Sequence, residues 1–147
     1  MFYGYLPAIL EGLVLTLEVS ALSLLIAGLF GLAGASAKLS GSRSARWCAE
    51  VYTTLIRGMP ELVLMLLIFY GGQIGINRLA DRYGWGYIDI PPFAAGVITI
   101  GFIFGAYLTE TFRGAILAVP KGQAEAGLAY AMTRGQVLRR IVLPQMV

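Results

Sequence analysis

Histidine is absent from this 147-residue chain, and cysteine occurs only once, as Cys48. Cys48 therefore has no partner for an internal disulfide. A zinc site built from Cys and His is excluded, and so are Ser-His-Asp and Cys-His nucleophilic systems. The P-loop pattern G-x-x-x-x-G-K-[ST] is also missing, so the chain cannot hydrolyse ATP by that mechanism. We predict neither catalytic residues nor a metal site, and we expect a protein that is not an enzyme.

Charged residues are scarce as well. They make up 13% of the chain, against about 25% in typical soluble domains. Hydrophobic residues make up 58% of the chain, and the mean hydropathy is +0.76. This composition predicts an all-α integral membrane protein. No Lys or Arg precedes Lys38, so the first apolar run lacks the basic region of a signal peptide, and we expect it to be retained as a span.

Three apolar runs predict three transmembrane helices, at about residues 8–37, 55–78 and 92–112. Together they predict one transmembrane domain over residues 1–147. Small residues at helical spacing let helix backbones approach closely in lipid, although glycine is also simply frequent in membrane helices. The glycines concerned are Gly28, Gly31 and Gly34, then Gly71, Gly72 and Gly75, then Gly96, Gly101 and Gly105.

Basic residues are distributed unequally between the loops. Residues 38–61 hold four of them and residues 113–140 hold five, whereas the loop between the second and third runs holds two. The positive-inside rule then places the two basic segments in the cytoplasm and the N-terminus outside. The aromatic side chains of the remaining loop suit the outer membrane interface.

A few charged residues lie within or beside the predicted spans. Glu18 lies inside the first span. Glu110 lies near the inner end of the third, and Arg113 follows three residues later, so these two can form a local ion pair. Charges at membrane depth tend to face a cavity or a partner, but Glu110 and Arg113 are also compatible with the cytoplasmic boundary. Both interpretations stay open.

The segment from Arg57 to Glu61 combines helix breakers with charge. Pro60 suits the first turn of the second span, and Glu61 then lies near a helix N-terminus, where negative charge is favoured. Glu61 is thus either a capping acid or an anionic contact for a cationic substrate or a neighbouring subunit. The candidate residues for a translocation path or gate are Glu18, Arg57, Glu61, Tyr70, Glu110 and Arg113.

Residues 121–144 form an ordered segment after the third span. We expect a first helix at about residues 123–132 and a chain reversal at Arg134-Gly135, because Gly tolerates positive φ. A second helix then runs to Leu143-Pro144, where Pro144 either ends it or starts another helix. The second helix has a contiguous apolar arc with Arg139 and Arg140 outside it. That arc consists of Val137, Leu138, Ile141 and Val142. The segment is either a docking site for another protein or an amphipathic helix at the inner membrane surface.

The same segment, E-A-G-L-A-Y-A-M-T-R-G-Q-V-L-R-R-I-V-L-P (residues 125–144), resembles the EAA loop of bacterial ABC importer permeases. That loop reads E-A-A, three residues, G, a spacer, then I-x-L-P. Gly127 replaces the third small residue, and Ala131 stands where the pattern has glycine, with Gly135 close by. The resemblance implies coupling to a separate ATPase through Glu125, Ala126, Gly127, Ala131, Gly135, Ile141, Leu143 and Pro144.

Residues 52–72 and 105–123 are similar to segments of polar amino acid permeases. Glu61, followed by L-V-L-M-L-L-I-F-Y-G, resembles the Q-type subunits of the histidine/lysine/arginine/ornithine permease family, with octopine and nopaline permeases as near relatives. The resemblance implies a type I importer permease fold with five spans, of which three are present here. The chain is therefore expected to be truncated at its C-terminus.

The family also implies import of cationic amino acids (histidine, arginine, lysine, ornithine) across a bacterial inner membrane. The implied partners are a second, M-type permease, a dimer of ATP-binding subunits that uses ATP and Mg, and a periplasmic substrate-binding protein. From the residues alone, an ion-coupled secondary amino acid carrier and a non-transporting membrane scaffold stay open as alternatives. No nucleic-acid partner is expected, because Lys and Arg are spread over the membrane-flanking loops.

Overall fold

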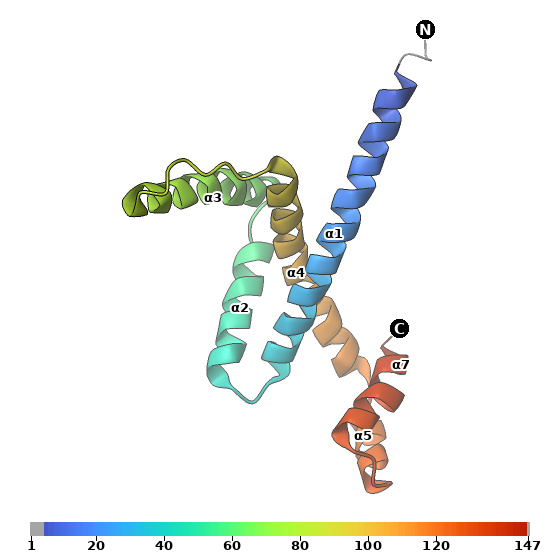
Figure 1. The fold of residues 1–147 in the computed structure, drawn as a ribbon. Helices are drawn as coiled ribbons and strands as arrows, with labels where there is room; N and C mark the ends of the chain where they lie inside the picture. The colour runs from blue at the N-terminus through green and yellow to red at the C-terminus, as the bar shows by residue number, and fades with distance from the viewer. Residues whose placement is uncertain (1–4, 147) are drawn as a thin grey trace.

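The computed structural model describes residues 5–146, and every regular element within them is helical (Figure 1). Three of these helices are long and apolar enough to cross a membrane, namely α1, α3 and α4. This confirms the predicted all-α class with three candidate spans. The elements in chain order are α1 (Leu6–Leu39), α2 (Arg43–Arg57), α3 (Glu61–Tyr83), α4 (Pro92–Ala118), α5 (Lys121–Ala129), α6 (Arg134–Val137), η2 (Leu138–Val142) and α7 (Leu143–Gln145).

The most extensive contact joins α1 to α4, and small residues make it possible. A Cβ added at Gly101 would lie 2.5 Å from Ile26 Cγ2, and one added at Gly34 would collide with the Thr109 side chain. Backbones that approach this closely gain dispersion and Cα–H contacts that do not depend on water. The prediction of close helix contacts is therefore confirmed at Gly31 and Gly34 of the first run and at Gly101 and Gly105 of the third, whereas a Cβ at Gly28 or Gly96 would meet open space. In the second run, a Cβ at Gly71, Gly72 or Gly75 would meet open space.

A short amphipathic helix, α2, runs back along α1 and closes the core from the other side. Its buried residue Ile56 packs with Leu64 of α3 and with Ile103 and Ala106 of α4. The Tyr52 hydroxyl donates a hydrogen bond of 2.6 Å to the Phe102 carbonyl of α4. The core therefore lies where α2, α3 and α4 meet, next to the α1–α4 contact.

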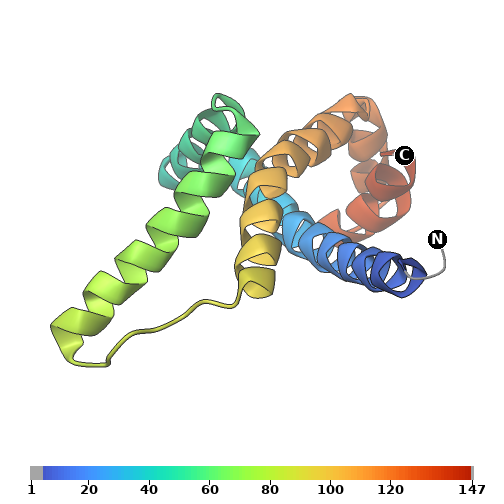
Figure 2. The same ribbon diagram turned by 90° about the horizontal axis from the view of Figure 1, so that it is seen from above.

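The helix boundaries near the second apolar run differ from the predicted span of residues 55–78. The chain leaves the helical path at Gly58–Pro60, so residues 55–57 end α2 and α3 starts at Glu61. Pro60 has no N–H and disfavours the α conformation for Met59, which explains the break. Figure 2 shows α3 leading away from the crossing of α1 and α4. In the third run, α4 continues six residues past residue 112, to Ala118.

The loop between α3 and α4 is held by two side-chain amides. Asn77 donates to the Ile88 carbonyl at 3.0 Å and accepts from the Ile88 N–H at 2.8 Å. Gln73 accepts from the Ile90 N–H at 3.1 Å. α3 itself ends in a left-handed residue, Gly84, with φ +70. These contacts supply partners for loop backbone groups that no helix or strand satisfies.

Candidate functional site

The C-terminal hairpin (residues 121–145) turns at Ala131, which has φ 59. The N–H of Met132 donates to the Gly127 carbonyl at 3.1 Å, and the N–H of Ala131 donates to the Leu128 carbonyl at 3.0 Å. These two bonds define a Schellman motif, in which the residue in the left-handed conformation is usually glycine. The glycine of the EAA pattern thus falls where the backbone requires positive φ. Ala131 keeps the turn but carries the steric cost of its Cβ.

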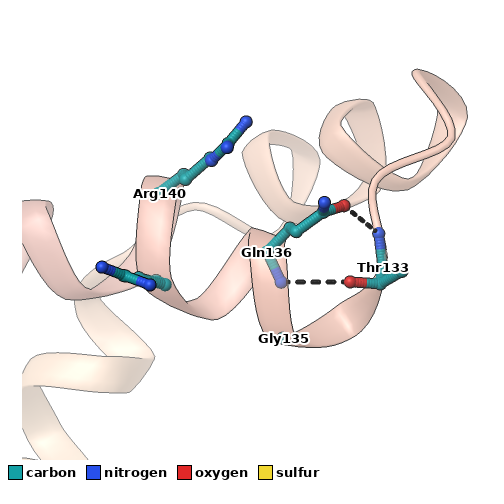
Figure 3. Close-up of a pocket in the computed structure, with 5 residues that line it drawn as sticks. Thr133, Gly135, Gln136 and Arg140 are labelled. Atoms are coloured by element: carbon teal, nitrogen blue, oxygen red, sulfur yellow. Dashed lines mark hydrogen bonds between the residues drawn. The ribbon is translucent and has the colours of Figure 1, made fainter.

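Gly135 does not reverse the chain, so that part of the prediction is wrong. It lies in the first turn of α6, and the positive-φ glycines among residues 5–146 are Gly84 and Gly86. Thr133 starts α6 with a capping box: its hydroxyl accepts from the Gln136 N–H at 3.3 Å. The Gln136 side chain accepts from the Thr133 N–H at 2.9 Å, and Arg140 points away from this pair (Figure 3).

The second arm of the hairpin widens into a π-turn just before Pro144. Proline has no N–H to donate to the carbonyl four residues earlier, and the Leu143 N–H instead donates five residues back, to Leu138. The residues of the predicted apolar arc differ in burial. Val137 is buried, and Ile141 is half-buried, but Leu138 is 47% exposed. Of the two alternatives for Pro144, the structure shows the second, because the chain stays helical through α7.

Gly127 lies in the interior of the C-terminal hairpin and allows the two arms to touch. A Cβ at this position would lie 2.6 Å from Ile141 Cδ1 and 3.1 Å from Val137 Cγ2. The glycine at the third position of the E-A-A sequence therefore leaves room for the Ile141 and Val137 side chains of the second arm. Glu125, two residues earlier, is exposed on the outer face of α5. The C-terminal hairpin also exposes apolar side chains, namely Leu128, Tyr130, Leu138 and Leu143.

A charged cluster joins α1, α2 and α4. Arg113 Nε donates to Glu110 Oε2 at 3.0 Å, which confirms the predicted local pair. The other oxygen, Glu110 Oε1, accepts from Lys38 Nζ of α1, which also lies 2.8 Å from Glu50 Oε2 of α2. Sequence reasoning missed Lys38 and Glu50. Lys38 stands in the last turn of α1 on the same face as Gly31, Gly34 and Ala35, and that spacing was the available signal.

A second group forms where α2 and α3 meet α4. The Arg57 guanidinium lies 5.6 Å from the centre of the Tyr107 ring, and the Glu61 carboxyl lies beside the Tyr107 hydroxyl. Tyr52 of α2 is close by in the core, where burial raises the pKa of its hydroxyl to about 12. The predicted residues Arg57 and Glu61 are therefore brought together, with Tyr107 as a partner that the sequence did not single out.

The remaining candidate path residues lie apart from these two groups. Glu18 is exposed on α1, more than five turns before Lys38 by helix spacing. Tyr70 is 59% exposed on α3 and packs edge-on against Phe69. The structure thus divides the predicted set into an α1–α2–α4 cluster, an α2–α3–α4 group and two isolated residues.

Three candidate spans followed by a small helical hairpin are the features of a multi-span membrane protein. Residues 27–147 match the family of binding-protein-dependent transport system inner membrane components. The match covers more than half of the chain, and the chain belongs to this family.

Relatives at the level of whole sequences are permease proteins. The chain is 56% identical over 147 residues to the histidine/lysine/arginine/ornithine transport system permease protein HisQ of Escherichia coli, covering 100% of this chain and 64% of that protein. It is 41% identical over 144 residues to the nopaline transport system permease protein NocQ of Agrobacterium fabrum, covering 97% of this chain and 61% of the relative. The chain thus spans less than two thirds of the length of these relatives.

A solved structure of an amino acid ABC transporter with histidines gives the same result for the fold. It aligns with a TM-score of 0.77 and 34% identity, over 97% of this chain and 62% of that one. The arrangement of α1 to α7 is therefore the arrangement of an ABC permease.

Proposed function

We propose that this chain is the permease subunit of an ATP-driven amino acid importer in a bacterial inner membrane, and that the C-terminal hairpin couples it to a separate ATPase. The observation that carries the proposal is the hairpin itself. It contacts the spans little and packs mainly on its own arms, α5 against α6 and η2. Its connection to the rest of the molecule is the end of α4. A rigid unit on a single stem suits the transmission of movement from a partner.

The outer surface of the C-terminal hairpin supports protein docking over adsorption to lipid. Val137 and Ile141, which would anchor an interfacial helix, face Gly127 inside the hairpin. Glu125, Leu128 and Tyr130 are left exposed on the surface of α5 and the turn that follows it. A carboxylate is repelled by an anionic membrane surface, whereas an exposed tyrosine is a residue type enriched where proteins bind proteins.

The orientation that this proposal needs has structural support. The Lys38–Glu110 ion pair places the C-terminal end of α1 beside the C-terminal half of α4. The basic segment after α1 and the C-terminal hairpin consequently lie toward the same end of the molecule, opposite the start of α1 (Figure 1). The positive-inside rule assigns both to the cytoplasm, where an ATPase would reach the hairpin.

Further subunits complete the proposed machine. An M-type permease would pair with this chain in the membrane, a dimer of ATP-binding subunits would use ATP and Mg below it, and a periplasmic protein would deliver the substrate. The ion-coupled alternative has less support, because both oxygens of Glu110 are already held by Lys38 and Arg113. A carboxylate held in this way is a poor proton carrier.

We further propose cationic amino acids as the substrate class. Relatives at 56% and 35% identity are named for histidine, lysine, arginine and ornithine, and for arginine. Within this chain, Glu61 is the residue best placed to face a cation, since it lies on the surface beside the Tyr107 hydroxyl. Uptake of labelled arginine by the complete transporter should be inhibited by unlabelled histidine and not by glutamine. Inhibition by glutamine alone would overturn this substrate class.

Coupling is tested by Glu125→Lys in the complete transporter. We expect the variant to insert and to pair with its permease partner, while the amount of co-purified ATP-binding subunit falls about tenfold, the effect of roughly 1.4 kcal/mol of binding free energy. Asp89→Lys is the matched control, because it makes the same charge change at an exposed position in the loop between α3 and α4. Equal recovery of the ATP-binding subunit with both variants would contradict a docking role for the hairpin.

A further inference from the structure

We infer that Lys38 is a positioning residue for transport: it ties α1 and α2 to α4 at the place where α4 leads into the C-terminal hairpin. The inference rests on the proposed coupling function and adds a residue to which that function assigns no role. The Lys38 ammonium lies between two carboxylates from different helices, Glu110 of α4 and Glu50 of α2. The charged cluster of Lys38, Glu50, Glu110 and Arg113 has no net charge.

Burial makes this ion pair different from an ordinary surface contact. The Lys38 side chain is 4% exposed, whereas the side chain of Glu50 is 63% exposed. One turn earlier on α1, Gly34 packs directly on Thr109, which is fully buried next to Glu110. The ammonium is therefore enclosed by closely packed backbone and has little freedom to turn toward water. A charge held in this way fixes both the distance and the direction between the two helices.

The position of the charged cluster along α4 connects it to the C-terminal hairpin. Glu110 lies eight residues before the end of α4 at Ala118, or roughly 12 Å along the helix axis. The residues of α4 between Glu110 and Ala118 are largely half-buried or exposed. A movement of the hairpin is thus transmitted to the rest of the molecule through the end of α4. The charged cluster is the ionic contact through which α4 would in turn move α1 and α2.

Without the Lys38 contact, α4 would still pack on α1, but the stem would bend or rotate with respect to α1 when the hairpin moves. The partner would then continue to hydrolyse ATP, while each hydrolysis event moved the spans less. A merely structural role predicts a different result, in which fewer complexes assemble but each assembled complex transports as well as the wild type. The ratio of uptake to ATP hydrolysis separates the two.

The test uses the complete transporter reconstituted in liposomes with labelled arginine, ATP and the substrate-binding protein. Lys38→Met is expected to lower the arginine taken up per ATP hydrolysed at least fivefold, with ATP hydrolysis per assembled complex within a factor of two of wild type. Arg43→Met is the control, since it removes one positive charge from an exposed position at the start of α2, and it should leave the ratio unchanged.

A second variant covers the case in which Lys38→Met does not assemble. Lys38→Met with Glu110→Met removes the buried ammonium and its half-buried carboxylate partner together and fills the space with flexible side chains, so that neither member of the pair is left without the other. The same fivefold fall in the ratio is expected. A ratio equal to that of Arg43→Met in either assembled variant overturns the inference and leaves the proposed function standing. If the wild type itself shows no ATP-driven uptake, both fail.

Discussion

The α1–α4 pair and the C-terminal hairpin both bring two helical segments together, but they are stabilised by different means. In the α1–α4 pair, glycines at positions 31, 34, 101 and 105 remove the side chains that would keep the backbones apart, and one buried ion pair closes the end. In the hairpin, local turn chemistry sets the geometry: a Schellman motif at Ala131 and a capping box at Thr133. One chain thus uses packing between distant segments in one region and local backbone preference in the other.

This difference has a consequence for how each region responds to substitution. A packed contact between distant segments fails when volume is added, because neighbouring backbones cannot move apart without losing the whole interface. A substitution in a local turn changes stability only by the free energy of one or two backbone conformations, and the rest of the molecule is unaffected. Substitutions in the α1–α4 pair should therefore have larger effects than those in the C-terminal hairpin.

The largest effect is expected for Gly105→Leu. A Cβ at this position would already lie 2.5 Å from Phe30 Cβ and 2.9 Å from the Tyr52 hydroxyl oxygen, so that α1 and α2 are both displaced. We expect a loss of about 3 kcal/mol in the free energy of unfolding in detergent. Gly96→Leu on the same helix meets open space and should be close to neutral. Similar stability of the two variants would show that α1 and α4 do not depend on close backbone contact.

An intermediate effect is expected for Thr133→Ala. The Thr133 hydroxyl accepts the Gln136 N–H at the start of α6, and its loss leaves that donor without its side-chain partner. The second arm of the C-terminal hairpin should be destabilised by about 1 kcal/mol, measured as roughly fivefold faster hydrogen exchange of its amides. Thr133→Ser keeps the hydroxyl and should exchange like the wild type. Equal exchange in all three proteins would mean that the cap does not stabilise the arm.

Two substitutions of opposite sign test the turn itself. Ala131→Gly removes the Cβ from a residue at φ 59 and should stabilise the C-terminal hairpin by about 1 kcal/mol. This is the steric cost of a Cβ in the left-handed conformation minus the larger conformational entropy that glycine loses on folding. Gly84→Ala places a Cβ at φ +70 in the equivalent motif at the end of α3 and should destabilise it by a similar amount. The measurement is hydrogen exchange of the amides at each helix end. Stability changes of the same sign in the two variants would contradict the conclusion that both helices end in the same left-handed motif.

The smallest effect is expected for Gly127→Ala, which restores the third small residue of the EAA pattern. The added methyl meets the terminal carbon of Ile141, which can rotate away, and the helix gains the preference of alanine over glycine of about 1 kcal/mol. We expect these contributions to offset each other to within roughly 0.5 kcal/mol. Gly127→Val, with two methyl groups, should destabilise the hairpin clearly more in the same exchange measurement.

Much of the architecture was predictable, because composition and periodicity are local properties. The apolar runs gave three candidate spans, and the spacing of Glu110 and Arg113 gave their ion pair. The motif from Glu125 to Pro144 located the C-terminal hairpin. Its turn was assigned to Gly135 instead of Ala131, since glycine is the usual residue at positive φ and alanine is not. A rule based on residue type fails where the surrounding motif imposes the conformation.

The sequence by itself determined that this is a helical membrane protein with a basic, EAA-like segment after its third apolar run. Low charge, long apolar runs and motif spacing are sufficient for that, because each acts over a few turns of helix. Only the tertiary structure decided that Lys38 is buried between Glu110 and Glu50, and that Arg57 and Glu61 meet Tyr107. These contacts join residues up to 72 positions apart, and such pairs are set by the angles at which helices cross.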